Sequence, residues 1–322
     1  MFRTRITDLF GIEHPIIQGG MRYVARAEVA AAVADGGGIG FISAHTQPTG
    51  EALLQELERA RALTNKPFGV NLTILPHLRG ARPEDYVEAI IASGVKFVET
   101  AGANPAPWFP RLKAAGIVIL HKCTSVRFAL KAQALGADAV SVAGFEAGGH
   151  PGEDPTPAMV MIPLLAKQLK IPFISSGGFA TGAGLVAALA LGAEGISLGT
   201  RFMLSTESPM HEAIKRRMLA ATERDTLLIL TSIGDTTRVL ANAISKCILE
   251  AEKAGSATVE ELLDFGGGPR WVAAAERGDV EGGAFALGLS AALIDEILPA
   301  AEIVRRIVAE AKDIIAQRFG VH

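Results

Sequence analysis

The sequence predicts an α/β fold, a (β/α)8 TIM barrel with a helical insertion after the eighth strand. Eight short apolar runs alternate with helix-length amphipathic segments, which is the pattern of parallel βα units. The runs are evenly spaced, as in a closed barrel. The turn after the first run, Gln18-Gly19-Gly20-Met21, lacks the glycine spacing of the dinucleotide-binding turn that an open doubly wound sheet would place there.

The expected strands are residues 15–18, 39–43, 68–72, 97–101, 118–122, 139–143, 173–176 and 196–199. The expected helices between them include residues 26–34, 51–62, 83–92, 125–135 and 182–191. Several of these helices end at a Gly-Ala or Ser-Gly pair, which stops a helix before the next strand.

The alternation stops after residue 201. Residues 209–257 are expected to form continuous helix, and Gly266-Gly267-Gly268-Pro269 then breaks the pattern. Residues 284–318 are expected to form two further helices. The last of these carries one apolar stripe at helical spacing, made of Ile303, Val304, Ile307, Val308, Ala311, Ile314 and Ile315. The sequence therefore predicts a barrel of residues 1–208 and 284–322, and a mainly helical insertion of residues 209–283.

Composition restricts the class of ligand. The chain has 322 residues, 49% of them hydrophobic, so it can bury a large core. A net charge of -3 gives no electrostatic footprint for nucleic acid, and a small-molecule substrate is expected instead. The first residues lack an apolar signal region, and the longest apolar stretches, near residues 185–191, are too short to span a bilayer. We expect a soluble, cytoplasmic protein without a membrane partner.

Cys123 and Cys247 are the two cysteines of the chain. Two cysteines alone make neither a disulfide framework nor a zinc site. Both are expected to be reduced thiols, and no metal centre is predicted.

Polar or glycine-rich segments follow six of the expected strands. In a barrel all strand ends meet at one rim, where the chemistry of such folds is found, so one shared site is expected. The segments are Gln18-Gly19-Gly20-Met21, Asn71-Leu72-Thr73, His121-Lys122-Cys123-Thr124, Gly144-Phe145-Glu146-Ala147-Gly148-Gly149-His150, Ser176-Gly177-Gly178 and Gly199-Thr200-Arg201.

Two of these segments predict a phosphate site. Ser176-Gly177-Gly178 and Gly199-Thr200 follow the seventh and eighth strands, where barrels bind phosphate through backbone amides and a helix N-terminus. The two hydroxyl groups add donors. The alternative is a pair of plain tight turns.

The opposite side of the rim can hold a planar ring. Gly20, Met21, Asn71 and Thr73 offer amides and side chains that can hydrogen-bond a heterocycle. Lys122 supplies a cation of the kind that a flavin needs beside its N1–C2 edge. The alternative for Lys122 is a salt bridge with Glu99.

The remaining histidines and Cys123 are given no role. His121 and Cys123 alternate with Lys122 along the strand, so they are expected to point into the surrounding layer. His14, His45 and His77 are isolated on loops.

His150 is the candidate for proton transfer. It follows a glycine-rich turn directly after the apolar run 139–142, and Gly148 and Gly149 let the backbone approach a ligand closely. The alternative is a surface loop in which the imidazole only caps a neighbouring group.

Together these six ordered segments resemble the nitronate monooxygenase family, formerly called 2-nitropropane dioxygenases, which are FMN-dependent TIM-barrel enzymes. The resemblance runs nearly the whole chain. It implies that His150 is the catalytic imidazole and that FMN is held by Gly20, Met21, Thr73, Lys122, Gly148, Ser176, Gly199 and Thr200.

The longer form of the motif, which runs on from His150 through Pro151-Gly152-Glu153, with Leu75-Pro76 after the third strand, is most similar to members that act as NADH:quinone reductases. FMN-type enoyl-acyl-carrier-protein reductases share the core of this motif, and a mycobacterial-type branch acts on CoA thioesters. Residues 287–292 lack the Gln or Met that other members often show there.

The resemblance implies an FMN-dependent oxidoreductase that oxidises nitronates or nitroalkanes with O2. NAD(P)H:quinone reduction, with NADH or NADPH as electron donor, is the alternative. A reductase of enoyl thioesters carried by ACP or CoA, a Schiff-base aldolase that uses Lys122, and a nucleotide-binding barrel without catalysis are less favoured. A homodimer is left open.

Overall fold

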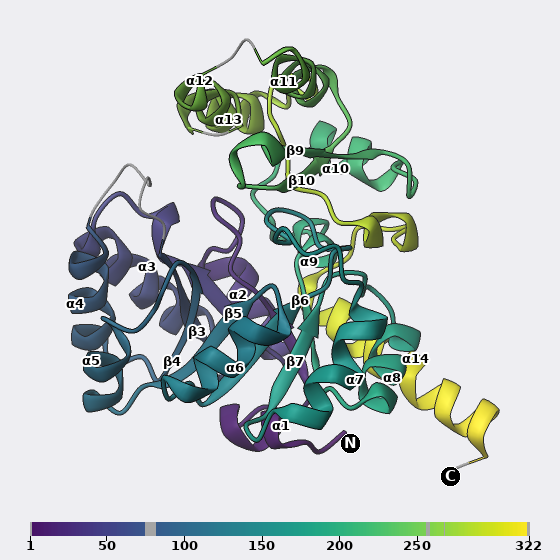
Figure 1. Ribbon diagram of the computed structural model, residues 1–322. Coiled ribbons are helices and arrows are strands. Elements are labelled where there is room, and N and C mark those ends of the chain that lie inside the picture. Colours follow the sequence, from purple (N-terminus) through teal and green to yellow (C-terminus); the bar gives the residue numbers. More distant parts are fainter. Residues whose placement is uncertain (1, 75–81, 256–257, 267, 321–322) are drawn as a thin grey trace.

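The computed structural model describes residues 2–74, 82–255, 258–266 and 268–320. Eight parallel strands close into a barrel, in which β8 pairs with β1 (Figure 1). The strands are β1 (Ile16–Gln18), β2 (Ile39–Ser43), β3 (Gly69–Ile74), β4 (Phe97–Gly102), β5 (Val118–Cys123), β6 (Ala139–Ala143), β7 (Phe173–Ser176) and β8 (Ile196–Leu198). The predicted fold class is confirmed. Leu75-Pro76, His77 and Gly267 lie outside the described residues.

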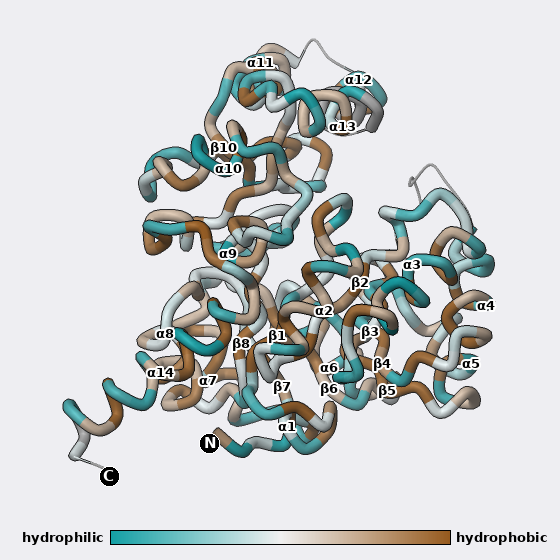
Figure 2. Tube along the Cα trace, turned by 180° about the vertical axis from the view of Figure 1, so that it is seen from behind, coloured by the Kyte–Doolittle hydropathy of each residue, from teal (hydrophilic) through white to brown (hydrophobic). Residues whose placement is uncertain are grey.

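Helices surround the barrel, and Figure 2 shows hydrophobic residues concentrated along the strands that they cover. The outer helices are α2 (Ala27–Asp35), α3 (Gly50–Leu63), α4 (Pro83–Ser93), α5 (Phe109–Ala114), α6 (Val126–Ala134), α7 (Ala158–Gln168), α8 (Gly182–Leu191) and α14 (Ala300–Phe319). A 3-10 turn, η1 (Ala44–Thr46), precedes α3.

The N-terminal end of the barrel is closed by α1 (Arg5–Phe10), which lies below the strands in Figure 1. Phe10 is buried there and packs edge-on against Phe41 and Phe97, with ring centroids 6.1 and 5.2 Å apart. This apolar plug leaves the opposite end of the barrel, where the strands finish, for a polar site.

The apolar stripe of the last helix completes the outer ring, as predicted, because α14 packs against α8 and α2. Ile303, Val304, Ile307, Val308 and Ala311 are buried, whereas Ile314 and Ile315 are only half-buried. A Cβ on Gly182 would lie 2.5 Å from the backbone nitrogen of Ala311, so the close approach of α8 to α14 requires glycine at this position.

The prediction of continuous helix over 209–257 is wrong. This segment contains α10 (Glu212–Leu219), β9 (Thr226–Ile229), the 3-10 turn η2 (Thr231–Ile233), β10 (Thr237–Leu240) and α11 (Ala243–Ala254). β9 and β10 form an antiparallel hairpin. The β-branched residues of the two strands favour extended backbone, and Gly234 turns the chain at a φ of 69°.

The insertion continues through α12 (Val259–Gly266) and α13 (Gly268–Arg277). The predicted break at residues 266–269 stays a prediction, because Gly267 lies outside the described residues. Figure 1 shows residues 209–283 as a lobe above the barrel mouth, joined to it near α9 (Thr200–Met203). The division into a barrel domain and an insertion domain stays a prediction.

Two α-helices were expected over residues 284–318. The structure instead has a 3-10 turn, η3 (Leu289–Leu293), followed by α14. Before η3 the chain is extended beside the hairpin, where Ala286 bridges Val239 and the Leu240 amide donates to the Phe285 carbonyl at 2.8 Å. Backbone pairing with β10 therefore replaces the first expected helix. None of the described helices is long and apolar enough to cross a membrane.

Candidate active site

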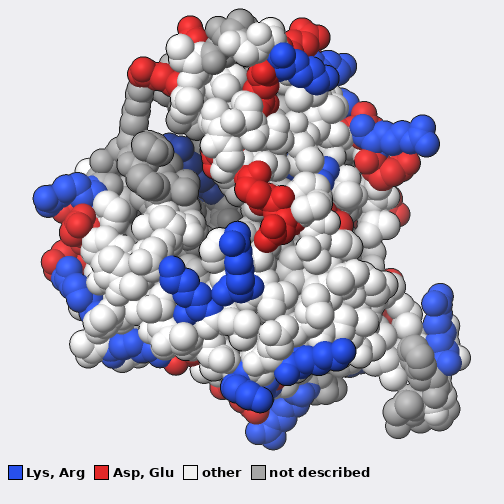
Figure 3. Space-filling view, in the orientation of Figure 1, with Lys and Arg blue, Asp and Glu red and all other residues white. Residues whose placement is uncertain are grey.

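The strand ends and the insertion enclose a cavity of about 890 Å³, here called the strand-end cavity. Figure 3 shows a hollow on this face between the barrel and the upper lobe. Nearly all the predicted site residues line the cavity: Gly20, Met21, Asn71, Thr73, Lys122, Gly148, Gly149, His150, Ser176, Gly177, Gly199 and Thr200. Gly178 is the exception. Its missing side chain would face Glu146 at 3.5 Å.

Glu99 organises one side of the cavity. It is 0% exposed, and its Oε2 accepts hydrogen bonds from the Gly20 amide at 2.8 Å and from Asn71 Nδ2 at 2.7 Å. Asn71 Oδ1 in turn accepts from the Thr73 hydroxyl at 3.1 Å. A Cβ on Gly20 would lie 2.0 Å from Asn71 Cγ, so only glycine fits beside this amide. Glu99 therefore fixes both the first turn and the orientation of the Asn71 amide.

The salt bridge considered between Lys122 and Glu99 is not formed. Within the described ranges Lys122 has no ion-pair partner, and it lines the strand-end cavity from the end of β5. The site role of Glu99 was missed by the sequence prediction, although a carboxylate at the centre of the apolar run 97–101 is a signal that could have indicated it.

The opposite side of the cavity offers donors for an anion. Ser176 is 6% exposed, and its hydroxyl has no hydrogen-bond partner among the described residues. Gly177 has a φ of 83°, which favours glycine. The nearest atom to a Cβ on Gly199 would be Met21 Sδ, at 3.7 Å, so the protein leaves open space in front of this backbone. A buried unpaired hydroxyl beside an open backbone turn fits a polar ligand.

Thr200 serves a different purpose as well. Its hydroxyl accepts a hydrogen bond from the Gly288 amide at 3.0 Å. Gly288 also passes close to Gly148, where a Cβ would lie 2.5 Å from the Gly288 nitrogen. These contacts hold the segment around Gly288 against the strand ends, and they explain why residue 148 must be small.

His150 stands at the boundary between the barrel and the insertion. Its side chain is 55% exposed, and Nε2 lies 3.4 Å from Oδ1 of Asp235 in the β9–β10 turn. Gly149 and Arg238 exchange two backbone hydrogen bonds, at 3.0 and 2.7 Å. Glu153 accepts from the amide and the hydroxyl of Thr236, at 3.0 and 2.5 Å. The loop that carries His150 is therefore clamped by the hairpin, and Asp235 is a neighbour that the sequence did not indicate.

Three aromatic side chains, Tyr23 from the barrel and Trp271 and Phe285 from the later part of the chain, line the cavity and are here called the aromatic group. Tyr23 and Trp271 line it with their rings 5.1 Å apart in a T-shaped arrangement, and Phe285 lies beside Trp271 at 5.5 Å. Tyr23 has a φ of 71°, which is rare for a residue with a side chain. Its amide donates to the Thr46 hydroxyl at 2.8 Å, which helps to hold this conformation. Strained backbone of this kind is concentrated at binding sites.

His121 and Cys123 are buried in the layer between β5 and the outer helices, as predicted, but both also form part of the wall of the strand-end cavity. His121 Nδ1 is hydrogen-bonded to the Thr100 hydroxyl at 2.8 Å, and its ring packs on Phe109 of α5. Burial lowers the pKa of His121 to about 4 and raises the pKa of the Cys123 thiol to about 12. Both side chains are therefore neutral at neutral pH.

His45 was expected to have no role, but it lines the cavity. Its Nε2 donates to the carbonyl oxygen of Thr73 at 2.6 Å, and burial lowers the pKa of the imidazole. His45 is therefore a neutral ring that holds the end of β3.

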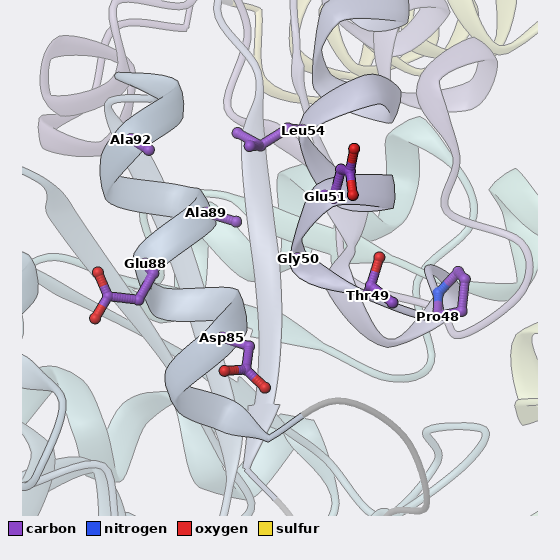
Figure 4. Close-up of a pocket in the computed structure, with 9 residues that line it drawn as sticks. All are labelled: Pro48, Thr49, Gly50, Glu51, Leu54, Asp85, Glu88, Ala89 and Ala92. Atoms are coloured by element: carbon purple, nitrogen blue, oxygen red, sulfur yellow. The ribbon is translucent and has the colours of Figure 1, made fainter.

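A second hollow lies on the outer surface between α3 and α4 (Figure 4). It contains three carboxylates, but Asp85 is hydrogen-bonded to Arg82 and Glu88 is paired with Arg111. In Figure 4 the Glu88 side chain points away from the hollow. The described residues contain no group of three or more His, Cys, Asp or Glu side chains that could hold a metal ion.

Comparisons with known proteins agree with this geometry. A family model described as nitronate monooxygenase matches residues 3–310. A nitronate monooxygenase of Paraburkholderia phytofirmans is 32% identical, over 97% of this chain and 96% of that protein. The structure of FabK from Thermotoga maritima superposes with a TM-score of 0.91 at 35% identity and covers 99% of both chains.

A further relative shares part of its length. The (3aS,4S,5R,7aS)-5-hydroxy-7a-methyl-1-oxo-octahydro-1H-indene-4-carboxyl-CoA dehydrogenase of Mycobacterium tuberculosis is 39% identical over 241 residues, which are 74% of this chain. The match covers 66% of that protein, so the chain spans slightly less than two thirds of its length.

Proposed function

The chain belongs to the nitronate monooxygenase family, and from that premise we propose that it is an FMN-dependent oxidoreductase that oxidises nitronates and nitroalkanes with O2. The single observation that carries the proposal is the strand-end cavity, which combines a polar ring-binding side, an anion-binding side and the solvent-exposed imidazole of His150. When bound, FMN supplies the transfer of electrons from the substrate to O2.

The residues of the cavity fit FMN at both ends. The unpaired Ser176 hydroxyl and the open backbone at Gly199 would hold the phosphate group. The Asn71 amide and the Gly20 turn, both held by Glu99, would bind the polar edge of the ring system. Lys122 would place its cation beside that edge. Met21 and the aromatic group would exclude water from the ring.

His150 would accept the proton that a neutral nitroalkane must lose from carbon before it can react. Asp235 would stabilise the imidazolium that this transfer forms, because its carboxylate lies 3.4 Å from Nε2. A preformed nitronate has already lost that proton, so His150 would then only orient the anion.

Replacing His150 tests this assignment. His150→Asn should reduce turnover of the neutral nitroalkane by about 10²- to 10⁴-fold, the usual contribution of a general base. Turnover of the corresponding nitronate should change far less, and FMN should remain bound. Equal losses for both substrates would mean that His150 positions the loop and is not the base.

A thioester substrate is favoured by a specific observation, the 39% identity to a carboxyl-CoA dehydrogenase over 74% of this chain. In this alternative, FMN passes electrons between a CoA or ACP thioester and NADH or NADPH; in the related quinone reductase, the nicotinamide nucleotide is the donor and a quinone the acceptor. Rapid bleaching of the flavin by a nicotinamide nucleotide, with no turnover of nitronates, would select it.

The Schiff-base aldolase would require a carbonyl substrate that is trapped on Lys122 by borohydride. The cytoplasmic location and the homodimer remain predictions; sedimentation of the purified protein would test the dimer.

A further inference from the structure

The strand-end cavity has a branch that leaves the barrel mouth toward the outer surface. The residues that line this part are Asn104 and Pro105, from the loop between β4 and α5, and Arg127, Phe128 and Lys131 of α6. We infer that this branch, here called the α6 branch, binds the adenosine diphosphate part of a ligand whose reactive end reaches FMN. The inference rests on the proposed flavin function, and it names a substrate or donor class for the same site.

Residues 100–137 carry positive charges but no negative ones. The chain as a whole has a net charge of -3, yet no Asp or Glu occurs between Glu99 and Asp138. Five Lys and Arg residues occur in that interval. Two of them have acidic partners elsewhere: Arg111 pairs with Glu88, and Lys113 pairs with Asp138.

The other three cations, Lys122, Arg127 and Lys131, all line the strand-end cavity. None of them forms an ion pair in the part of the chain that the structure describes. Arg127 and Lys131 are four residues apart in α6, so they share one face of the helix. Figure 3 shows basic side chains over α6, below the hollow and next to a group of acidic ones. The lining of the cavity also contains two acidic residues, Glu153, which is bound to Thr236, and Asp154.

Helix stability does not account for these residues. Arg127 lies in the first turn of α6, where a cation opposes the helix dipole. The side chain of Phe128 is left 43% exposed next to it, and the Arg127 guanidinium lies 4.6 Å from the centroid of that ring. The exposed Phe128 ring with the planar Arg127 guanidinium over it, and the Lys131 cation one turn further along α6, match an adenine ring that is followed by phosphate groups.

Two classes of ligand carry this chemistry. A CoA thioester would place its acyl end at the barrel mouth, and a nicotinamide nucleotide would place its nicotinamide ring there. Nitronates and quinones have no such part and would not use the α6 branch.

The test measures binding and does not depend on turnover. The FMN-loaded protein is titrated calorimetrically with free CoA, NAD⁺ and NADP⁺. Arg127→Ala and Lys131→Ala should each weaken binding of the ligand by about 5-fold, as expected for loss of one exposed charge pair, and the double variant by about 25-fold. Added salt should weaken binding to the unaltered protein more than to the double variant.

Lys167→Ala is the matched control, because Lys167 is an exposed cation at the end of α7 that does not line the cavity. It should leave binding unchanged. Preferential binding of CoA identifies a thioester substrate, and preferential binding of NAD⁺ or NADP⁺ identifies the electron donor. Failure of all three ligands to bind at millimolar concentration would overturn the inference. So would binding to the double variant that equals binding to the unaltered protein.

The outcome separates this inference from the proposed function. A protein that retains FMN and turns over nitronates, but binds none of the three nucleotides, refutes the α6 branch alone. A purified protein that neither contains nor takes up FMN refutes the proposed function instead.

Discussion

Replacing Gly199 tests the phosphate end of the proposed flavin site without disturbing the fold. Its φ of -107° is open to any residue, and a Cβ would meet Met21 Sδ at an ordinary contact distance of 3.7 Å. Gly199→Ala should therefore change the free energy of unfolding by less than about 1 kcal/mol, within the range of substitutions that create no cavity and no strain. The new methyl group would occupy space that the protein leaves open in front of the backbone.

The expected loss of FMN affinity can be estimated from the hydrogen bond that the new methyl group would block. A hydrogen bond to a charged group contributes about 1.5–3 kcal/mol, which corresponds to roughly 10- to 150-fold in the dissociation constant. Loss of one such amide–phosphate bond should weaken FMN binding by that factor. The measurement is a fluorescence titration of the apoprotein with FMN, accompanied by thermal unfolding of the same samples.

Gly178→Ala is the matched comparison. Gly178 has a φ of 80°, so alanine there is strained and should cost about 1–2 kcal/mol of stability. Gly178 does not line the cavity, so FMN affinity should change little. The two variants should thus separate affinity from stability. Unchanged FMN binding by a folded Gly199→Ala protein would refute the phosphate placement.

Three further outcomes are expected. Glu99→Leu should lower the free energy of unfolding by at least about 2 kcal/mol in urea titrations, because the buried Asn71 amide and the part-buried Gly20 amide lose their acceptor, whereas Glu99→Gln should retain most of the stability. Lys122→Met should lower the reduction potential of the bound flavin, and an unchanged potential would remove Lys122 from the ring edge. The His121 pKa falls from 6.5 to about 4 on folding, so its contribution is fully present above pH 6.5 and is lost as pH falls toward 4. Between pH 6.5 and pH 4 the free energy of unfolding should fall by up to about 3 kcal/mol through this group, and by less in His121→Asn. If the free energy of unfolding depends on pH in the same way for both proteins, the assignment is contradicted.

The barrel and the rim could be predicted from sequence because both depend on local patterns. The alternation of apolar runs gives the strands, and parallel strands bring Gly20, Lys122 and Ser176 to one edge however far apart they are in the chain. The hairpin of residues 226–240 was missed because its apolar residues also fit helical spacing. Its pairing with Ala286, more than 40 residues away, is a tertiary contact.

The supporting contacts could not be predicted for the same reason. Asp235 reaches His150 only because Gly149 pairs with Arg238 across the insertion. Tyr23 meets Trp271 through a backbone conformation that no local signal indicates. Such contacts are set by how two distant segments pack, and a single sequence holds no record of that packing.

The central claim, that this cavity binds FMN and oxidises nitronates, is tested most directly by anaerobic rapid mixing of the purified protein with a nitronate, with flavin absorbance as the signal. The purified protein should be yellow, and its flavin should be bleached by the nitronate and recover its colour when O2 is admitted. Flavin that is bleached only by NADH or NADPH, and stays fully oxidised with the nitronate, would contradict it.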